Sequence, residues 1–112
     1  QAAMKEGDTV ITSYRDHAHM LATGMESRGV MAELTGRSGG YSRGKGGSMH
    51  MFSRDKGFFG GHGIVAAQVP IGTGLGFAHK YKDEDNLCHQ SGAGLRSFQH
   101  GRSLEAAGPL YH

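Results

Sequence analysis

Four polar residues that could hold an anion or a polar heterocycle stand in a glycine-rich stretch, residues 39–76: Lys45, Ser48, His50 and His62. Because each glycine costs order on folding, glycines this dense indicate backbone that turns through positive φ or closely approaches another group. A flexible Gly/Ser linker is the alternative, and the apolar side chains interspersed here argue against it. The stretch therefore predicts a ligand-facing loop system.

A second polar cluster begins with Tyr14 and Arg15. Arg15 can bind a phosphate through a planar fork of donors and Tyr14 can add a hydroxyl, which makes an anion site one interpretation. On spacing alone, a surface ion pair between Arg15 and Asp16 is favoured. His17 and His19 would lie on opposite sides of a strand, which is poor geometry for one metal ion.

Residues 39–45 also match the pattern G-x-x-x-x-G-K of a phosphate-binding loop. The next residue is Gly46, where the magnesium-binding hydroxyl of such a loop belongs, and a helix rather than a strand is expected before it. We therefore exclude a nucleoside-triphosphatase signature.

The first of the elements that must position these residues is a strand at residues 9–13, which are rich in β-branched side chains. This strand would deliver Tyr14 and Arg15 to its end, a place well suited to function. Before it, residues 1–6 have the pattern of the last turns of a helix, with Gly7 as a left-handed cap.

Two further helices are predicted. Residues 25–36 should contain a short amphipathic helix that Ser27 caps and Gly36 closes. Residues 64–82 form the longest apolar region and predict a tightly packed helix, kinked or late-starting because of Pro70. Its expected core-facing residues are Val65, Val69, Leu75 and Phe77.

The last part of the chain has little regular pattern. Leu87 and Cys88 begin what should be a buried strand, but from His89 onward there is no period-2 run and only a weak helical one. The tail is therefore predicted to be irregular.

Composition excludes several classes of protein. The 112 residues allow one small domain, and 12 basic against 10 acidic residues are too balanced to indicate a nucleic-acid surface. The single cysteine excludes an internal disulfide and fits a reducing compartment. No apolar run approaches the roughly 20 residues that a membrane-spanning helix needs.

Three stretches within residues 1–88 carry a family resemblance: ITSYRDHAHMLATGM, GVMAELTGRSGGYSRGKGGSMHMFS, and GGHGIVAAQVPIGTGLGFA followed by NLC. In them the chain resembles part of the α subunit of the E1 component of bacterial pyruvate dehydrogenases. Branched-chain 2-oxo acid and acetoin dehydrogenases are the alternatives within the thiamine-diphosphate-dependent family. Ala18 and Ala66 stand where the family usually has glycine.

The resemblance implies an α/β fold, a parallel sheet flanked by helices, of which this chain is an incomplete fragment. It implies a thiamine diphosphate cofactor at an interface with a β subunit. Tyr14 and Arg15 match the family's diphosphate-contacting pair, and the main chain of Gly63 and Val65 matches the segment that touches the aminopyrimidine ring.

The resemblance also implies a reaction and a set of partners. Pyruvate would be decarboxylated, and the two-carbon unit would pass to a lipoyl group on the E2 component to supply acetyl-CoA. His50 and His62 are candidate catalytic groups; without the resemblance each would be interpreted as a hydrogen-bonded loop histidine. The location implied is the cytoplasm of a bacterium or the mitochondrial matrix of a eukaryote, with neither nucleic acid nor membrane as a partner.

The tail departs from the family. After the strand the family continues with a Gly-Asp-Gly motif whose Asp, with a downstream Asn, holds Mg²⁺; this motif is missing, so no metal ligand is assigned. Codons for residues 91–111, read one nucleotide later, can spell QGQVYEAFNMAALWKLPV, the family's next helix. We therefore expect a partial domain at residues 1–88, an out-of-frame tail at residues 89–112, and no activity of the isolated chain.

Two other classes stay open as weaker alternatives. A glycine-rich RNA-binding module could use the pairs Arg28-Gly29, Arg43-Gly44 and Gly101-Arg102, although the near-balanced charge disfavours it. A histidine-based metal protein could use His17, His50 and His62, although none of these are at the helical i, i+4 spacing.

Overall fold

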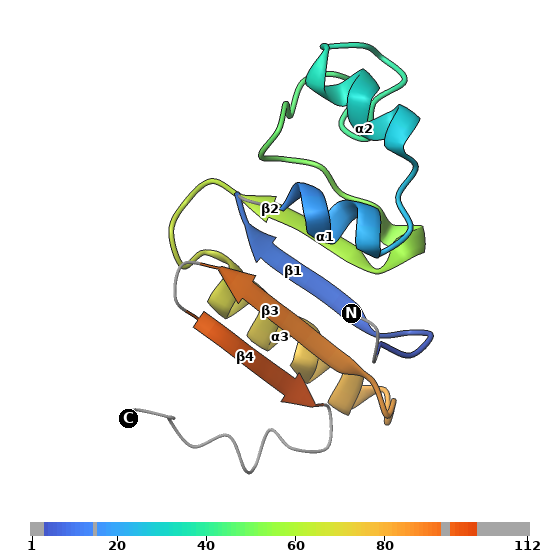
Figure 1. Ribbon diagram of the computed structural model, residues 1–112. Helices are drawn as coiled ribbons and strands as arrows, with labels where there is room; N and C mark the ends of the chain where they lie inside the picture. The colour runs from blue at the N-terminus through green and yellow to red at the C-terminus, as the bar shows by residue number, and fades with distance from the viewer. Residues whose placement is uncertain (1–3, 15, 93–94, 101–112) are drawn as a thin grey trace.

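The computed structural model describes residues 4–14, 16–92 and 95–100, which form a four-stranded sheet with helices on both faces. The strands β2 (Phe58–His62), β1 (Thr9–Ser13), β3 (Leu87–Gly92) and β4 (Leu95–His100) lie side by side in that order (Figure 1). β1 runs parallel to β2 and to β3, whereas β4 pairs antiparallel with β3. The predicted class, an α/β fragment with a parallel sheet flanked by helices, is confirmed.

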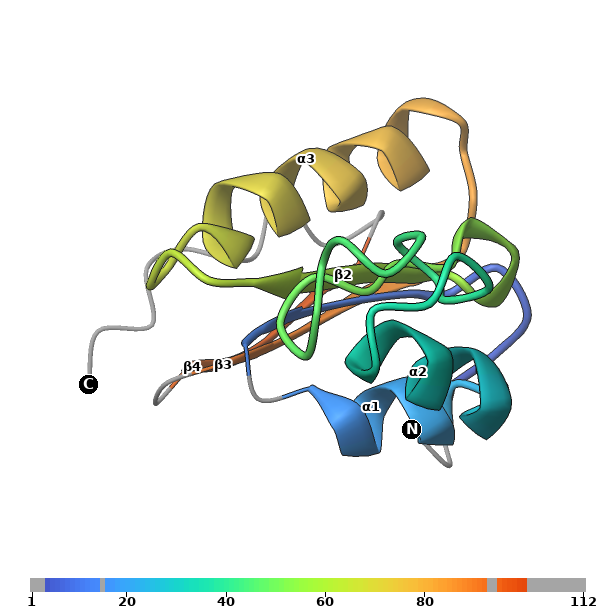
Figure 2. The ribbon, with the colours of Figure 1, turned by 90° about the horizontal axis from the view of Figure 1, so that it is seen from above.

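The helices divide between the two faces of the sheet, as Figure 2 shows. α1 (His17–Ala22) lies on one face, with α2 (Ser27–Leu34) on the same side but beyond the edge strand β2, and α3 (Gln68–Tyr81) covers the other. α3 is the crossover that two parallel strands require, because it connects β2 to β3 past the intervening β1. Within the described ranges, no helix combines the length and apolar character needed to cross a membrane.

The apolar core lies between the sheet and the α1/α2 layer. Successive side chains of a strand point to opposite faces, so Val10 points into this layer while Thr9 points toward α3. The cluster on the α1/α2 side consists of Val10, Met20, Met25, Val30, Met51 and Phe58.

On the other face, α3 lies closer to the sheet because it packs through its glycines. This face is also more polar. A Cβ at Gly72 would lie 2.5 Å from the side-chain amide of Gln90 on β3, so any larger residue would require Gln90 to move. Gln68 and His79 are the large buried side chains of α3, while Val65 before the helix and Phe77 within it are 68% and 60% exposed. The prediction that Val65 and Phe77 face a core was wrong because glycines occupy that side of the helix.

Several predicted boundaries are confirmed. The strand at residues 9–13 is β1, and the helix within 25–36 is α2, with Gly36 in a left-handed conformation (φ 70°) after its end. α3 is late-starting rather than kinked, since Pro70 falls in its first turn, where a missing N–H removes no helical hydrogen bond. Ser27 does not cap α2; the N-cap residue is Glu26.

Three predictions need correction. Of the N-terminal helix, residues 1–3 lie outside the described residues, and Met4 to Gly7 form a turn, although Gly7 has the expected positive φ of 91°. His17 and His19 lie in helix α1, not in a strand. The described residues from His89 to His100 are not irregular, because β3 continues to Gly92 and β4 (Leu95–His100) pairs with it through main-chain hydrogen bonds that need no side-chain pattern. Residues 101–112 lie outside the described residues.

Candidate functional site

The candidate site lies at the carboxyl edge of the two parallel strands β1 and β2. Ser13 is paired with His62, so Tyr14 and Gly63 leave the sheet side by side. Ligands of open α/β sheets bind outside the carboxyl ends of the strands. The structure thus brings together the two segments that the sequence singled out, with Tyr14 partly buried; Arg15 lies outside the described residues.

The segment after β2 presents main chain and apolar side chains at this edge. Ile64 and Val65 are 77% and 68% exposed, and the main chain of Val65 has no hydrogen-bond partner among the described residues. Ala66 has a positive φ of 68°, which is costly for any residue with a Cβ. The glycine that the family usually has at this position would carry no such cost.

His50 belongs to this edge. Its Nδ1 lies 3.2 Å from the carbonyl oxygen of Gly61, and its Cε1 and Nε2 lie 3.2 and 3.5 Å from the point that a Cβ on Gly63 would occupy. Nδ1 is therefore engaged with the strand, while Nε2 lies beside Gly63.

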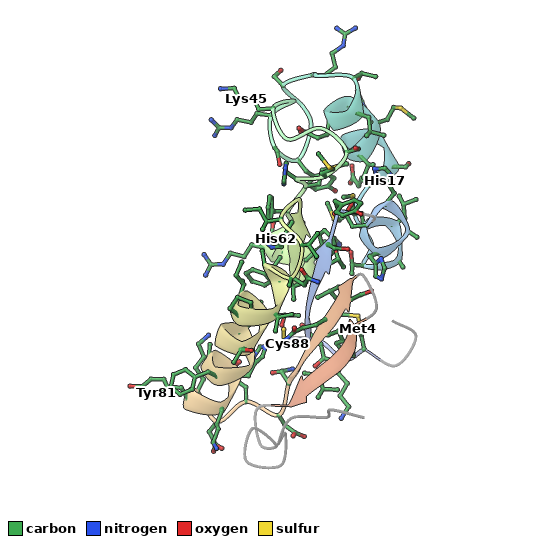
Figure 3. All side chains as sticks on the ribbon, turned by 90° about the vertical axis from the view of Figure 1, so that its left-hand side faces the viewer. Met4, His17, Lys45, His62, Tyr81 and Cys88 are labelled. Atoms are coloured by element: carbon green, nitrogen blue, oxygen red, sulfur yellow. The ribbon has the colours of Figure 1, made fainter. Side chains whose placement is uncertain are left out.

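His62 points along its own strand instead. Its Nε2 lies 3.1 Å from the carbonyl oxygen of Phe59, and its ring meets Phe52 edge to face at 5.9 Å between centroids. Figure 3 places His62 over the sheet, with the glycine-rich loop beyond it. Of the two candidate histidines, His50 is the one whose ring lies beside the Gly63 main chain.

Asp16 is a site residue that the sequence analysis treated only as an ion-pair partner. Its side chain is fully buried, and neither carboxylate oxygen has a hydrogen-bond partner. A Cβ on Gly61 would stand 2.0 Å from Asp16 Oδ2, so the carboxyl packs directly on that glycine. Burial raises the pKa of Asp16 to about 6, against smaller lowering effects of its own amide, His17 and His50. An acidic residue just after a strand, facing the pair Gly60-Gly61, is the signal that could have found it.

The glycine-rich loop is organised from inside by Glu33 of α2. This buried carboxylate accepts hydrogen bonds from the amides of Ser42, Gly44, Gly46 and Gly47 at 2.7, 2.7, 2.7 and 3.1 Å. Burial alone would raise the pKa of Glu33, but the four amides outweigh it and hold the pKa below its usual value.

The main-chain amides of Ser42, Gly44, Gly46 and Gly47 are therefore not available to a ligand, because they bind an internal carboxylate, and the ligand-facing role of this loop's side chains stays a prediction. Lys45 and Ser48 are exposed, and in Figure 3 Lys45 lies at the outer end of the loop, away from His62. The P-loop reading fails on the same observation, since four of the amides that would wrap a phosphate are taken.

No group of three or more His, Cys, Asp or Glu residues suited to a metal ion occurs in the part of the chain that the structure describes. His17 is exposed on α1, while His50 and His62 contact separate main-chain carbonyls. The histidine-based metal site gains no support.

A cavity of about 720 Å³ lies at the opposite, amino edge of the sheet. Thr9, His79 and Glu84 line it and form a hydrogen-bonded series, with Thr9 Oγ1 3.2 Å from His79 Nε2 and His79 Nδ1 2.7 Å from Glu84 Oε2. This series connects the end of α3 to β1. None of the predicted site residues lines this cavity.

The family model of the dehydrogenase E1 component matches residues 1–94. The pyruvate dehydrogenase E1 component subunit alpha of Rhizobium meliloti is 71% identical over 87 residues, 78% of this chain and 25% of that protein. The protein of that name from Zymomonas mobilis is 58% identical over 107 residues, 95% and 30% of the two chains, a match that extends past Cys88.

A plant relative agrees with these. The mitochondrial pyruvate dehydrogenase E1 component subunit alpha-1 of Oryza sativa is 55% identical over 85 residues, 76% of this chain and 22% of that protein. The chain thus spans about a quarter of the length of the curated relatives it matches. On these matches, the chain belongs to the dehydrogenase E1 component family.

Proposed function

We propose that this chain is the cofactor-binding part of the α subunit of a pyruvate dehydrogenase E1 component, and that the β1/β2 edge is one half of a thiamine diphosphate pocket. The observation that carries the proposal is the pairing of Ser13 with His62, which puts Tyr14 beside the Gly63–Val65 segment. The names of the relatives favour pyruvate over branched-chain 2-oxo acids or acetoin as the substrate.

The residues present fit one end of the coenzyme. A polar heterocycle needs hydrogen-bonding main chain at an accessible edge, and the exposed Val65 segment, whose main chain has no partner among the described residues, offers it. Gly63 adds room, since a Cβ there would meet only the His50 ring. At the diphosphate end, Tyr14 can donate from its hydroxyl, and Arg15 is proposed to supply the charged fork.

The residues do not fit the magnesium ion that the family uses. Mg²⁺ at a diphosphate is held by one or two carboxylates together with phosphate oxygens. The described residues offer no group of ligands, and the Gly-Asp-Gly motif is missing from the sequence. We therefore assign no metal ligand to this chain.

Thiamine diphosphate, when bound, supplies the carbanion chemistry that decarboxylates a 2-oxo acid. The protein supplies placement. The main chain of Gly63 and Val65 orients the heterocycle, and the side chains of Ile64 and Val65 exclude water from it. His50, with Nδ1 held at the Gly61 carbonyl, exchanges a proton at Nε2.

The partners follow from what this edge exposes. Ile64 and Val65 are large apolar side chains left in solvent, and a β subunit that completes the pocket would cover them. The lipoyl group of E2 would then take up the two-carbon unit. The compartment proposed is the bacterial cytoplasm, or the mitochondrial matrix if the source is a eukaryote.

We further propose that residues 89–112 are an out-of-frame tail following a deletion after Cys88. Gln90 supports this interpretation, because it is buried beneath α3 with both side-chain amide atoms unpaired. An unpaired buried amide costs about 1–3 kcal/mol, so this residue is poorly adapted to its position.

A chimaera tests the proposed function. Residues 1–88 would replace the matching segment of the Rhizobium meliloti α subunit, which is then produced with its β subunit. We expect saturable thiamine diphosphate binding and pyruvate decarboxylation, both lost in Arg15→Ala, whereas the 112-residue chain alone should show neither. A chimaera that assembles with the β subunit but does not bind the coenzyme would refute the proposal.

The same chimaera separates the alternative substrates. Equal turnover of branched-chain 2-oxo acids or acetoin would move the assignment to those enzymes. Salt-sensitive RNA retention by the isolated chain would instead support the RNA-binding alternative.

A further inference from the structure

Asp16 is unusual because a buried carboxylate nearly always has hydrogen-bond partners. Here both oxygens are inaccessible to solvent and unpaired. Asp16 stands at the N-cap position of α1, yet its side chain makes no capping hydrogen bond there. The carboxyl therefore contributes no hydrogen bond to the stability of α1.

The carboxyl and His50 meet at one glycine. Asp16 Oδ2 packs on the Cα of Gly61, and His50 Nδ1 contacts the carbonyl oxygen of the same residue at 3.2 Å. Since Gly61 lies at the end of β2, both groups are held against a strand rather than on a free loop.

Among the described residues, His17 on α1 and His50 act electrostatically on Asp16 and lower its pKa, while the His62 ring is turned to the Phe59 carbonyl. In a site of low polarity, the charge on one of these groups changes the protonation of the other.

We infer that Asp16 is a positioning residue for His50: its buried carboxyl, across Gly61, determines whether the imidazole carries a proton at Nε2, the nitrogen beside Gly63. A charged Asp16 favours the imidazolium, and a neutral Asp16 releases it. The use of this coupling in catalysis depends on the function proposed above; the coupling itself is a property of the chain without coenzyme.

The test is an NMR titration of the 112-residue chain that follows the Asp16 carboxyl carbon and the His50 ring nitrogens. We expect Asp16 to titrate near pH 6 and the His50 signals to show an inflection at the same midpoint. Asp16→Asn should abolish that inflection. His50→Gln should raise the Asp16 midpoint by roughly half a unit to one unit, because it removes a neighbouring positive charge.

Two variants serve as controls. His17→Gln should also raise the Asp16 midpoint, and the His50 inflection should move with it. Asp55→Asn, which removes an exposed carboxylate at the opposite edge, should leave both curves unchanged. A His50 curve without an inflection at the Asp16 midpoint, or the same curve in Asp16→Asn, would overturn the inference even if a variant folds poorly, since the first comparison uses the unaltered chain.

The chimaera separates this inference from the proposed function. If the function is right and the coupling exists, Asp16→Asn should remove an inflection near pH 6 from the pH profile of kcat while thiamine diphosphate binding is retained. If the isolated chain shows the coupling but the chimaera is inactive, the proposed function is rejected, whereas the coupling of Asp16 to His50 is retained.

Discussion

Two regions on opposite faces of the sheet, the loop around Glu33 and the glutamines beside α3, satisfy their buried polar groups very differently. On the α1/α2 face, Glu33 accepts four main-chain hydrogen bonds beside an apolar core that includes Met20 and Phe58. On the α3 face, Gln68 and Gln90 are buried with unpaired amide atoms. The family model covers the first face and, on the second, α3 and β3, whereas β4 lies beyond its last matched residue, 94.

The difference teaches that an unpaired buried group can have two origins. On the proposals above, Gln90 is unpaired because an out-of-frame tail meets α3, and Asp16 is unpaired because the proposed site uses a titratable group. Substitutions distinguish the two, because removing a poor fit costs nothing, whereas removing a functional group changes the behaviour of its neighbour.

The largest expected effect on stability is at Glu33, on the α1/α2 face. Glu33→Ala should destabilise the protein by about 3 kcal/mol, because four amides lose a charged acceptor in a buried position. Denaturant unfolding would measure this, and amide exchange at Gly44 and Gly46 would locate it. Glu26→Ala, which removes an exposed carboxylate from the same helix with no capping hydrogen bond, is the matched control and should change stability little. Equal effects of the two substitutions would mean that Glu33 does not organise the loop.

Glu33 and Asp16 should respond to pH in opposite directions. Glu33 has a lowered pKa, so its contribution is present above the ordinary value of 4.5 and is lost as pH falls through its folded pKa. Asp16 has a raised pKa, so the folded state binds its proton more tightly, and stability falls as pH rises from 3.8 to about 6.

Asp16→Asn should therefore stabilise the chain by roughly 1–3 kcal/mol at neutral pH, with the gain vanishing below about pH 4. Unfolding of both proteins at a series of pH values would measure the slope. A constant difference at all pH values would show that the carboxyl does not titrate in this range.

On the α3 face, a substitution that removes the unpaired polar atoms of Gln90 should increase the stability of the protein. Gln90→Met should stabilise the protein by about 1–2 kcal/mol, since a flexible apolar side chain of similar length needs no partner. Gln90→Glu, which places an unpaired charge at the same point, should destabilise it. Thermal unfolding would compare the three proteins; a loss of stability in Gln90→Met would mean that the amide has a partner.

The smallest effects concern the two alanines at family glycine positions. Ala66→Gly should stabilise by about 0.5–1 kcal/mol, because Ala66 has a φ of 68°. Ala18→Gly, in the exposed side of helix α1, should destabilise by about 1 kcal/mol. If both substitutions changed the free energy of unfolding in the same direction, the explanation from the backbone conformations of Ala66 and Ala18 would be contradicted.

Local patterns predicted the elements well where a strong period or a glycine decided them. β1 at Thr9–Ser13 and the positive φ at Gly7 and Gly36 are examples. The edge shared by Tyr14 and Gly63 was predicted through the family resemblance rather than through spacing. The roles of these residues in binding a coenzyme stay predictions.

Contacts between residues that are far apart along the chain were not predicted from the sequence. Glu33 accepts hydrogen bonds from loop amides 9 to 14 residues away. Asp16, which follows β1, packs on Gly61 of the neighbouring strand β2. The buried side of α3 was missed because glycine carries no hydropathy signal, although it allows the closest approach to a sheet. The continuation of β3 beyond Cys88 and the whole of β4 were missed because their side chains lack alternation, while main-chain pairing does not depend on it.

The central claim is that an enzyme segment ending at Cys88 has been joined to a tail in another reading frame, and the nucleotide sequence tests it most directly. Reading the codons of residues 91–111 one nucleotide later should give a sequence that begins QGQVYEAFNMAALWKLPV, or a close variant of it. Codons that give no such helix in the shifted frame would contradict the claim, and β3 and β4 would then have to be explained as a tail that belongs to this protein.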